Sequence, residues 1–124
     1  MILADTSIWI ELFRRGGFKA ELENLILNDQ LCIHPHVIAE LACGTLPDRQ
    51  KTLAYLDNLI ALHALPLSDV RFFIETRNLA SRGIGLTDAH LLASCLSTPG
   101  VQLWTIDSAL GRVAASLNIR ALIP

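Results

Sequence analysis

Met1-Ile-Leu-Ala-Asp-Thr-Ser-Ile-Trp-Ile10 is the stretch that predicts the fold. Its first four residues form an apolar run too short for a helix, and an apolar pattern that suits a buried helix resumes at Ile8. The order predicts a buried strand, an acidic turn and a helix, the opening of a parallel α/β unit. Ligands of open parallel sheets gather at the carboxyl ends of the strands, where Asp5 would lie. Asp5 could equally be only the N-cap of the following helix.

Predicted strands and helices alternate along the rest of the chain. We expect strands at residues 1–4, 30–34, 61–65 and 101–106, and an edge strand at 120–123. We expect helices that begin near residue 6 and at 18–28, 35–43, 49–60, 69–81, 88–96 and 108–117, with Asp48, Ser68 and Thr87 as caps and Arg14-Arg15-Gly16-Gly17 as a loop. This alternation predicts the α/β class, as a single three-layer α/β/α domain around a short parallel sheet, over residues 1–124.

The composition is unusually apolar for so small a protein. Apolar residues make up 52% of the 124 residues and charged residues 18%, against about 45–50% and about 25% in typical domains. We therefore expect an apolar face that is buried against a partner or a second copy. The net charge of −2 argues against a protein that simply coats RNA or DNA, but it leaves open an enzyme that reaches phosphates through a metal ion.

The cysteines and the first residues predict a compartment. Cys32, Cys43 and Cys95 are odd in number, far apart and in apolar contexts, so we expect small core residues in a reducing cytosol. The chain begins without the basic region of a signal peptide and meets Asp5 at once. These features predict a soluble, cytoplasmic protein.

Three further carboxylates are candidates for the same sheet edge as Asp5. Asp107 repeats the pattern of Asp5, since a buried strand precedes it and a helix follows, and Asp88 opens another helix. Glu40 lies in an otherwise apolar helix without a Lys or Arg three or four residues away. We therefore expect it to be buried and to need a partner, which could be a remote arginine or a cation.

Four carboxylates at one edge would repel one another and raise their own pKa values. A divalent cation would relieve that repulsion. All-oxygen ligands favour Mg²⁺ or Mn²⁺, and the sequence contains no Cys/His set typical of zinc. The pattern is typical of metal-assisted phosphodiester hydrolysis.

Four blocks of the sequence resemble a known family. They are Met1 to Ile10, His34-Pro-His-Val-Ile-Ala-Glu-Leu41, Gly83-Ile-Gly-Leu-Thr-Asp-Ala-His-Leu-Leu92 and Leu103-Trp-Thr-Ile-Asp107. They resemble the acidic motifs of PIN-domain ribonucleases, most of all the VapC toxins of bacterial toxin–antitoxin pairs, and they follow the family order over the whole chain. The resemblance implies an acidic site of Asp5, Glu40, Asp88 and Asp107, with Thr6 and Thr105 as supporting hydroxyls. It also implies an RNA substrate, an antitoxin that blocks the site and a homodimer.

Arginines are the candidates for contacts to RNA. Many relatives carry a basic residue where Ser108 follows the last aspartate, so Arg112, about one turn later, is the substitute that we expect. Arg14 and Arg15 follow the first helix and could grip the RNA backbone, although an ordinary solvated loop would have the same composition.

Other functions remain to be weighed. A metal-free ribonuclease could use His34, His36, His63 and His90 as acid and base. An Asp-x-Asp phosphatase is disfavoured because Ser7 takes the second Asp position, and a phospho-acceptor receiver domain lacks its late lysine, since Lys51 is the last. A catalytically degenerate PIN-like domain that only binds a protein is the non-enzymatic alternative. Trp9 and Trp104 are expected in the core beside the two strand ends, and not as stacking platforms for bases.

Overall fold

Four short parallel strands form the centre of the protein. The computed structural model describes residues 1–123. The strands are β1 (Ile2–Ala4), β2 (Leu31–Ile33), β3 (Ile60–Ala61) and β4 (Gln102–Trp104), and their order in the sheet is β3-β2-β1-β4. Every neighbouring pair is parallel. The α/β class predicted from the first ten residues is confirmed.

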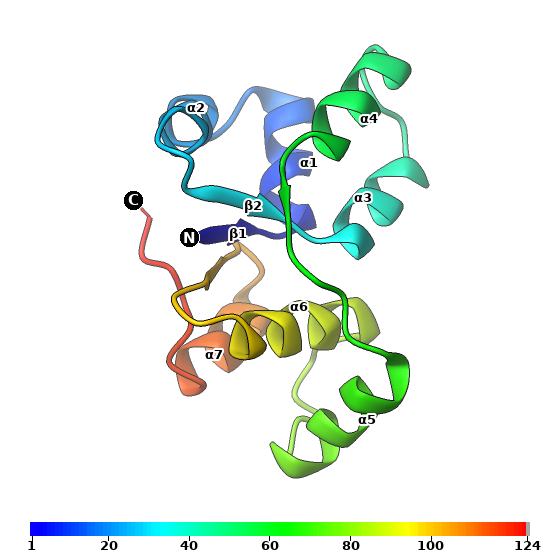
Figure 1. Cartoon of the computed structure of the whole chain (residues 1–124), viewed down its shortest axis with the longest axis vertical. Helices are drawn as coiled ribbons and strands as arrows, with labels where there is room; N and C mark the ends of the chain where they lie inside the picture. Colours follow the sequence, from blue (N-terminus) through cyan, green and yellow to red (C-terminus); the bar gives the residue numbers. More distant parts are fainter. Residues whose placement is uncertain (124) are drawn as a thin grey trace.

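Helices cover both faces of this sheet (Figure 1). Within residues 1–123 they are α1 (Thr6–Arg15), α2 (Lys19–Leu27), α3 (Pro35–Ala42), α4 (Arg49–Asp57), α5 (Leu67–Thr76), α6 (Leu86–Ser97) and α7 (Ser108–Ser116). Helices α1, α2 and α4 lie on one side of the sheet, and α6 and α7 lie on the other, with α5 packed beyond α6. The result is the expected three-layer α/β/α arrangement.

The core forms where the strands meet the helices, because the strands are too short and apolar to face water. Leu3, Ala4, Cys32, Ile33 and Leu103 are completely buried. Trp9 and Trp104 are 1% and 3% exposed, which confirms that both indoles belong to the core. No helix within residues 1–123 has the length and apolar character needed to cross a membrane.

The strand order reverses beside β1. The chain moves outward from β1 to β2 and β3, and then returns to place β4 on the other side of β1. In open parallel sheets, ligands bind outside the carboxyl ends of the strands at such a reversal. Asp5 directly follows β1, and Thr105 directly follows β4. The topology therefore brings these two segments, a hundred residues apart, to the expected ligand-binding edge.

Several predicted strands are shorter than expected. β3 contains only Ile60–Ala61, where we predicted residues 61–65, because β2 ends at Ile33 and offers no further partner. The predicted edge strand at 120–123 reduces to one parallel bridge between Arg120 and Leu103. Strand β4 likewise ends at Trp104, and Ile106 is exposed.

Helix boundaries also differ from prediction. Arg14 and Arg15 belong to the last turn of α1, which ends only when Gly16 adopts a left-handed φ of 69°, so the predicted loop was wrong for the two arginines. Helix α5 ends at Thr76, not near residue 81, because Asn78 has a positive φ of 54° that a helix cannot accommodate. Helix α4 ends at Asp57, where we expected it to reach residue 60.

The predicted caps were wrong in three cases. Pro66 precedes α5, so Ser68 lies inside that helix, and Gly85 precedes α6, so Thr87 lies inside it. Asp48 does stand at the N-cap position of α4, but its side chain makes no capping hydrogen bond. A proline or glycine immediately before a helix decides the start more strongly than a nearby polar side chain, because it sets the backbone angle of the turn.

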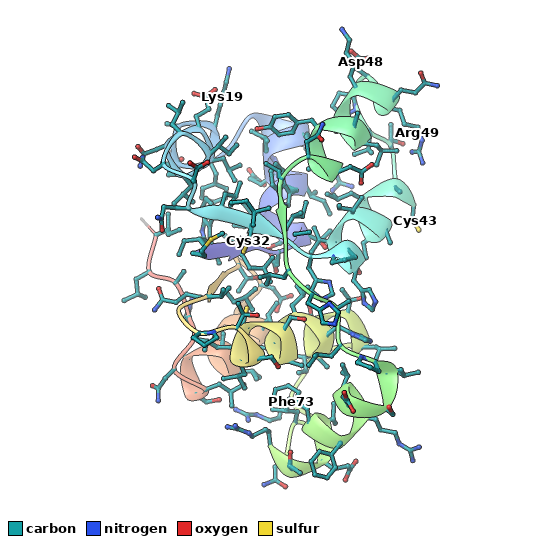
Figure 2. The ribbon with its side chains drawn as sticks, in the orientation of Figure 1. Lys19, Cys32, Cys43, Asp48, Arg49 and Phe73 are labelled. Atoms are coloured by element: carbon teal, nitrogen blue, oxygen red, sulfur yellow. The ribbon has the colours of Figure 1, made fainter. Side chains whose placement is uncertain are left out.

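The cysteines divide into two groups. Cys32 and Cys95 are buried as expected, whereas Cys43 is exposed at the end of α3. Figure 2 shows Cys32 inside the sheet and the Cys43 sulfur at the periphery. The apolar neighbours of Cys43 in the sequence face inward on the opposite side of the helix, so the prediction of a core residue was wrong there.

Candidate active site

Asp5 lies at the end of β1 and is almost entirely buried, with 4% of its surface exposed. Ser7 Oγ donates a hydrogen bond of 2.5 Å to Asp5 Oδ1, and Thr105 Oγ1 donates one of 2.5 Å to Oδ2. The amide of Ile8 donates to Oδ1 at 3.3 Å, so Asp5 is also the N-cap of α1. Capping and membership of an acidic site, which the sequence presented as alternatives, coexist in this residue.

The environment of Asp5 opposes its ionisation. Burial raises the pKa of Asp5, and the negative charge of Asp88 raises it further. The hydrogen bonds from Ser7, Thr105 and Ile8 favour the ionised form and lower the pKa, but they do not cancel the effect of burial. A carboxylate in such a position gains stability from any cation that approaches it.

Asp107 lies at the other side of the strand reversal. It is exposed and caps α7, since Asp107 Oδ1 accepts a hydrogen bond of 2.8 Å from the amide of Leu110. Its own amide donates to Thr105 Oγ1 at 3.0 Å. Thr105 therefore links Asp5 and Asp107 directly, because one hydroxyl donates to the first and accepts from the backbone of the second.

Asp88 approaches the same place from α6. Asp88 Oδ2 accepts a hydrogen bond of 3.1 Å from the amide of Gly85, which fixes the carboxylate at the first turn of the helix. Burial raises the pKa of Asp88, and the charges of Asp107 and Glu40 raise it further. The electrostatic coupling shows that Asp88 faces the other acids.

Glu40 is exposed, so the prediction that it is buried was wrong. The buried face of α3 contains Val37 and Leu41, and Glu40 lies on the side that faces α1. Glu40 Oε1 accepts a hydrogen bond of 2.6 Å from Thr6 Oγ1. A helix that reads as apolar throughout can thus still present one carboxylate to a polar opening.

The structure therefore brings the four predicted acids and both predicted hydroxyls together. The ion pairs within residues 1–123 are Arg15–Glu11 at 2.8 Å and Lys51–Asp48 at 3.8 Å, so no Lys or Arg of the described chain neutralises any of the four acids. Arg14 is not the remote partner that Glu40 was considered to need.

The donor set suits a hard divalent cation. Its oxygens come from carboxylates and hydroxyls, which favour Mg²⁺ or Mn²⁺ over zinc. Within residues 1–123, no three carboxylate, imidazole or thiol side chains already converge on one point in the manner of a finished metal site. Both oxygens of Asp5 and one oxygen of Asp88 accept hydrogen bonds from the protein, so ligation would require these side chains to turn.

The predicted cationic residues lie at different distances from the acids. Arg14 lines a small cleft together with Glu40, Phe13 and Leu46, so it stands beside the site. Arg15 is held by Glu11. Arg112 is exposed on α7, five residues after Asp107, which places it about 140° around the helix from that aspartate at about 100° per residue.

The histidines form a separate cluster. His34 is completely buried, its Nδ1 accepts from the amide of His36, and its Nε2 lies 3.0 Å from Ser94 Oγ. Burial, followed by the charges that His36 and His90 can carry, lowers the pKa of His34 to about 4. The rings of His36 and His90 lie 4.0 Å apart between centroids. This packing serves the contact between α3 and α6 and does not resemble an acid–base pair around a substrate.

Two residues beside the site escaped prediction. Ser7 Oγ donates to Asp5 and accepts from the amide of Ile106 at 3.2 Å, so it ties the two strand ends together. Its place directly after the Asp-Thr pair was the only signal in the sequence. Arg120 extends along α7, and nothing in the sequence relates it to that helix.

Comparison with known proteins agrees with this geometry. A model of the PIN domain family matches residues 2–116. The chain is 38% identical over 119 residues to Ribonuclease VapC32 of Mycobacterium tuberculosis, in strains CDC 1551 / Oshkosh and ATCC 25618 / H37Rv, with 96% of this chain and 94% of each relative covered. The crystal structure of PAE2754 from Pyrobaculum aerophilum has the same fold, with a TM-score of 0.62 at 21% identity over 90% of this chain and 83% of the other. With the family match, the relatives and the acidic edge in agreement, this chain belongs to the PIN-domain family and, within it, to the VapC-type ribonucleases.

Proposed function

We propose that residues 1–124 act as one PIN-like unit, a metal-dependent endoribonuclease that serves as the toxin of a toxin–antitoxin pair. The observation that carries this proposal is the mutual effect of the acids at the strand reversal. Asp88 is destabilised in its ionised form by burial and by Asp107 and Glu40, and no cation of the described chain offsets that effect. A protein that had no use for a bound cation would gain nothing from this arrangement.

Asp5, Asp88, Asp107 and Glu40 would hold one or two Mg²⁺ ions, with Mn²⁺ as the alternative. When bound, such an ion lowers the pKa of a coordinated water and stabilises the charge that develops on the phosphate. Thr105 and Ser7 hold the carboxylate of Asp5 in place, and Thr6 does the same for Glu40. Because water is the nucleophile, the products would carry 5′-phosphate and 3′-hydroxyl ends, and 2′,3′-cyclic phosphate ends would contradict this mechanism.

The arginines would contact the RNA backbone. Arg14 is the best placed of the predicted three, because it borders the cleft that contains Glu40. Arg15 would have to leave Glu11 to reach a phosphate, and Arg112 would reach only RNA that runs along the outer side of α7. The proposed order of importance is therefore Arg14, then Arg112, then Arg15.

Protein partners and location complete the proposal. The cleft of Phe13, Arg14 and Leu46 combines apolar surface with a charge next to Glu40, which suits an antitoxin segment that blocks the site. A second copy of the chain could cover exposed apolar side chains such as Phe72, which is 70% exposed, and Leu67, which is 60% exposed. We propose a cytoplasmic homodimer that is inhibited by its antitoxin.

The direct test is cleavage of end-labelled tRNA and rRNA fragments by the partner-free protein in Mg²⁺, Mn²⁺ or EDTA. Asp5→Asn and Asp107→Asn should each lower the rate by about 10³-fold, since the Lewis-acid contribution of several kcal/mol corresponds to about 1.4 kcal/mol per factor of ten. Asp69→Asn on α5 is the matched control, because this aspartate lies away from the sheet edge.

The other outcomes separate the competing functions. Cleavage that persists in EDTA would indicate histidine chemistry. A protein that neither cleaves RNA nor binds Mg²⁺ or Mn²⁺ in calorimetry would instead be a catalytically degenerate PIN-like domain that binds a protein.

A further inference from the structure

A groove beside the candidate active site has no role in the proposed reaction so far. It lies between the end of β4 and the segment that follows α7, and its walls include Thr105, Ile106, Arg120, Leu122 and Phe18. Thr105 belongs to both places, because its hydroxyl donates to Asp5 while the residue lines the groove. The groove therefore continues directly from the acidic edge. Figure 1 shows the segment after α7 returning along the sheet toward the N-terminus.

Arg120 is the cation of this groove, and a glycine positions it. Gly111 is buried in α7, and a Cβ atom added there would lie 3.0 Å from Arg120 Cζ and 3.1 Å from Nη2. The guanidinium thus lies flat on the helix where a side chain is missing. Gly111 is four residues after Asp107, which places it about 40° around the helix and about 6 Å along it. The charge of Arg120 is therefore held about one turn from an acid of the site.

No acid of the described chain takes up this charge. The ion pairs within residues 1–123 do not include Arg120, and its side chain is absent from the hydrogen bonds found among those residues. The opposite wall is apolar, since Ile106 is 52% exposed and Leu122 is 89% exposed. A cation beside exposed apolar side chains suits a nucleotide, whose phosphate needs the charge and whose base needs the apolar surface.

We propose that this groove binds single-stranded RNA next to the bond that is cut, with a backbone phosphate on Arg120 and a base against Ile106 and Leu122. The proposal rests on the proposed ribonuclease function and names Arg120 as a residue that positions the substrate. It also explains why Gly111 occupies the middle of a helix, where alanine is the better helix former.

The test is binding of fluorescein-labelled single-stranded RNA of about 12 nucleotides and randomised sequence, a length within the range of single-strand sites. Anisotropy is measured in Mg²⁺ at several salt concentrations, with Asp5→Asn present in every protein so that the RNA stays intact. Arg120→Gln should weaken binding and flatten the slope of log K against log salt by about 0.7, the share of one phosphate on a single strand. Arg71→Gln removes the same charge from α5, away from the groove, and should leave the slope unchanged.

Gly111→Ala supplies the second variant. Its new methyl group would displace the guanidinium while leaving the helix intact, so thermal melting should show an unchanged or higher Tm together with the binding defect of Arg120→Gln. The double variant should bind no worse than Arg120→Gln alone.

Each result decides the matter. Equal slopes for Arg120→Gln and Arg71→Gln would overturn the groove proposal and leave the ribonuclease proposal standing, and the groove would then suit an acidic protein segment better. A protein that binds no RNA in any of these conditions would overturn both.

Discussion

Thr105 Oγ1 lies 2.5 Å from Asp5 Oδ2, so a residue at the end of β4 holds the carboxylate at the end of β1 across a hundred positions of sequence. The same hydroxyl accepts the amide of Asp107 at 3.0 Å. Through these two bonds a single side chain sets the relative position of two acids, which gives the first prediction.

Thr105→Val should lower metal-dependent cleavage by about 10- to 100-fold, the usual cost of losing a partner of a metal ligand. Valine keeps the shape but removes the hydrogen bond that lowers the pKa of Asp5, so that pKa should rise further. The acid limb of the pH–rate profile should therefore move to higher pH. Thr105→Ser keeps the hydroxyl and should restore both the rate and the profile, whereas an unmoved acid limb in Thr105→Val would show that Thr105 does not act on Asp5.

The metal-free protein should lose stability as the pH rises. Asp5 and Asp88 both have raised pKa values in the folded state, so they bind protons more tightly when folded than when unfolded. Their favourable contribution is complete below the unfolded pKa near about 4 and is lost as the pH rises through the higher folded values. Thermal melts in EDTA from acidic to neutral pH should show this decline, and Mg²⁺ should reduce it.

Asp5→Asn removes one of these two groups and provides the control. Its Tm in EDTA should exceed that of the parent at neutral pH, although the variant should not cleave RNA. A lower Tm for Asp5→Asn at neutral pH would mean that the hydrogen bonds of Asp5 outweigh its burial.

Thr6→Val tests the contact between α1 and α3. Thr6 Oγ1 donates to Glu40 at 2.6 Å, and Glu40 is exposed, so water can replace much of this bond. We expect the cleavage rate to fall by no more than about tenfold, in keeping with a net value of about 0.5–1.5 kcal/mol for such a bond. Glu40→Gln should be the more severe change, and steady-state kinetics of the two variants would show the order. A reversed order would mean that Thr6 has its own contact with substrate or metal.

Ser94→Ala should destabilise the fold without removing activity. Ser94 Oγ donates to the carbonyl of His63 at 2.9 Å and therefore accepts from His34 Nε2, all in the buried contact beneath α6. Leaving these groups without partners costs about 1–3 kcal/mol, measurable by urea denaturation. Ser97→Ala on the same helix removes only an exposed bond to Ala93 and should stay within about 0.5 kcal/mol of the parent. Loss of RNA cleavage in stably folded Ser94→Ala would support a catalytic histidine.

Much of the candidate site follows from local sequence. A short apolar run that ends at an aspartate and leads into a helix can hardly be anything but a parallel strand end, and Asp5 and Asp107 share that pattern. Both also cap the helix that follows, because the geometry that ends a strand at a sheet edge exposes the first amides of the next helix. The order of the strands then places the two ends together.

The sequence by itself therefore determined the fold class, the acidic edge and the identity of its four carboxylates, because these depend on periodicity and on what immediately follows each strand. Only the tertiary structure decided that Glu40 is exposed, that β3 stops after two residues and that Ser7 and Thr105 share the work of holding Asp5. It alone placed Arg120 on Gly111. These features depend on which helix face turns inward and which distant segments meet, and such contacts arise from packing, to which residues far apart in the chain contribute together.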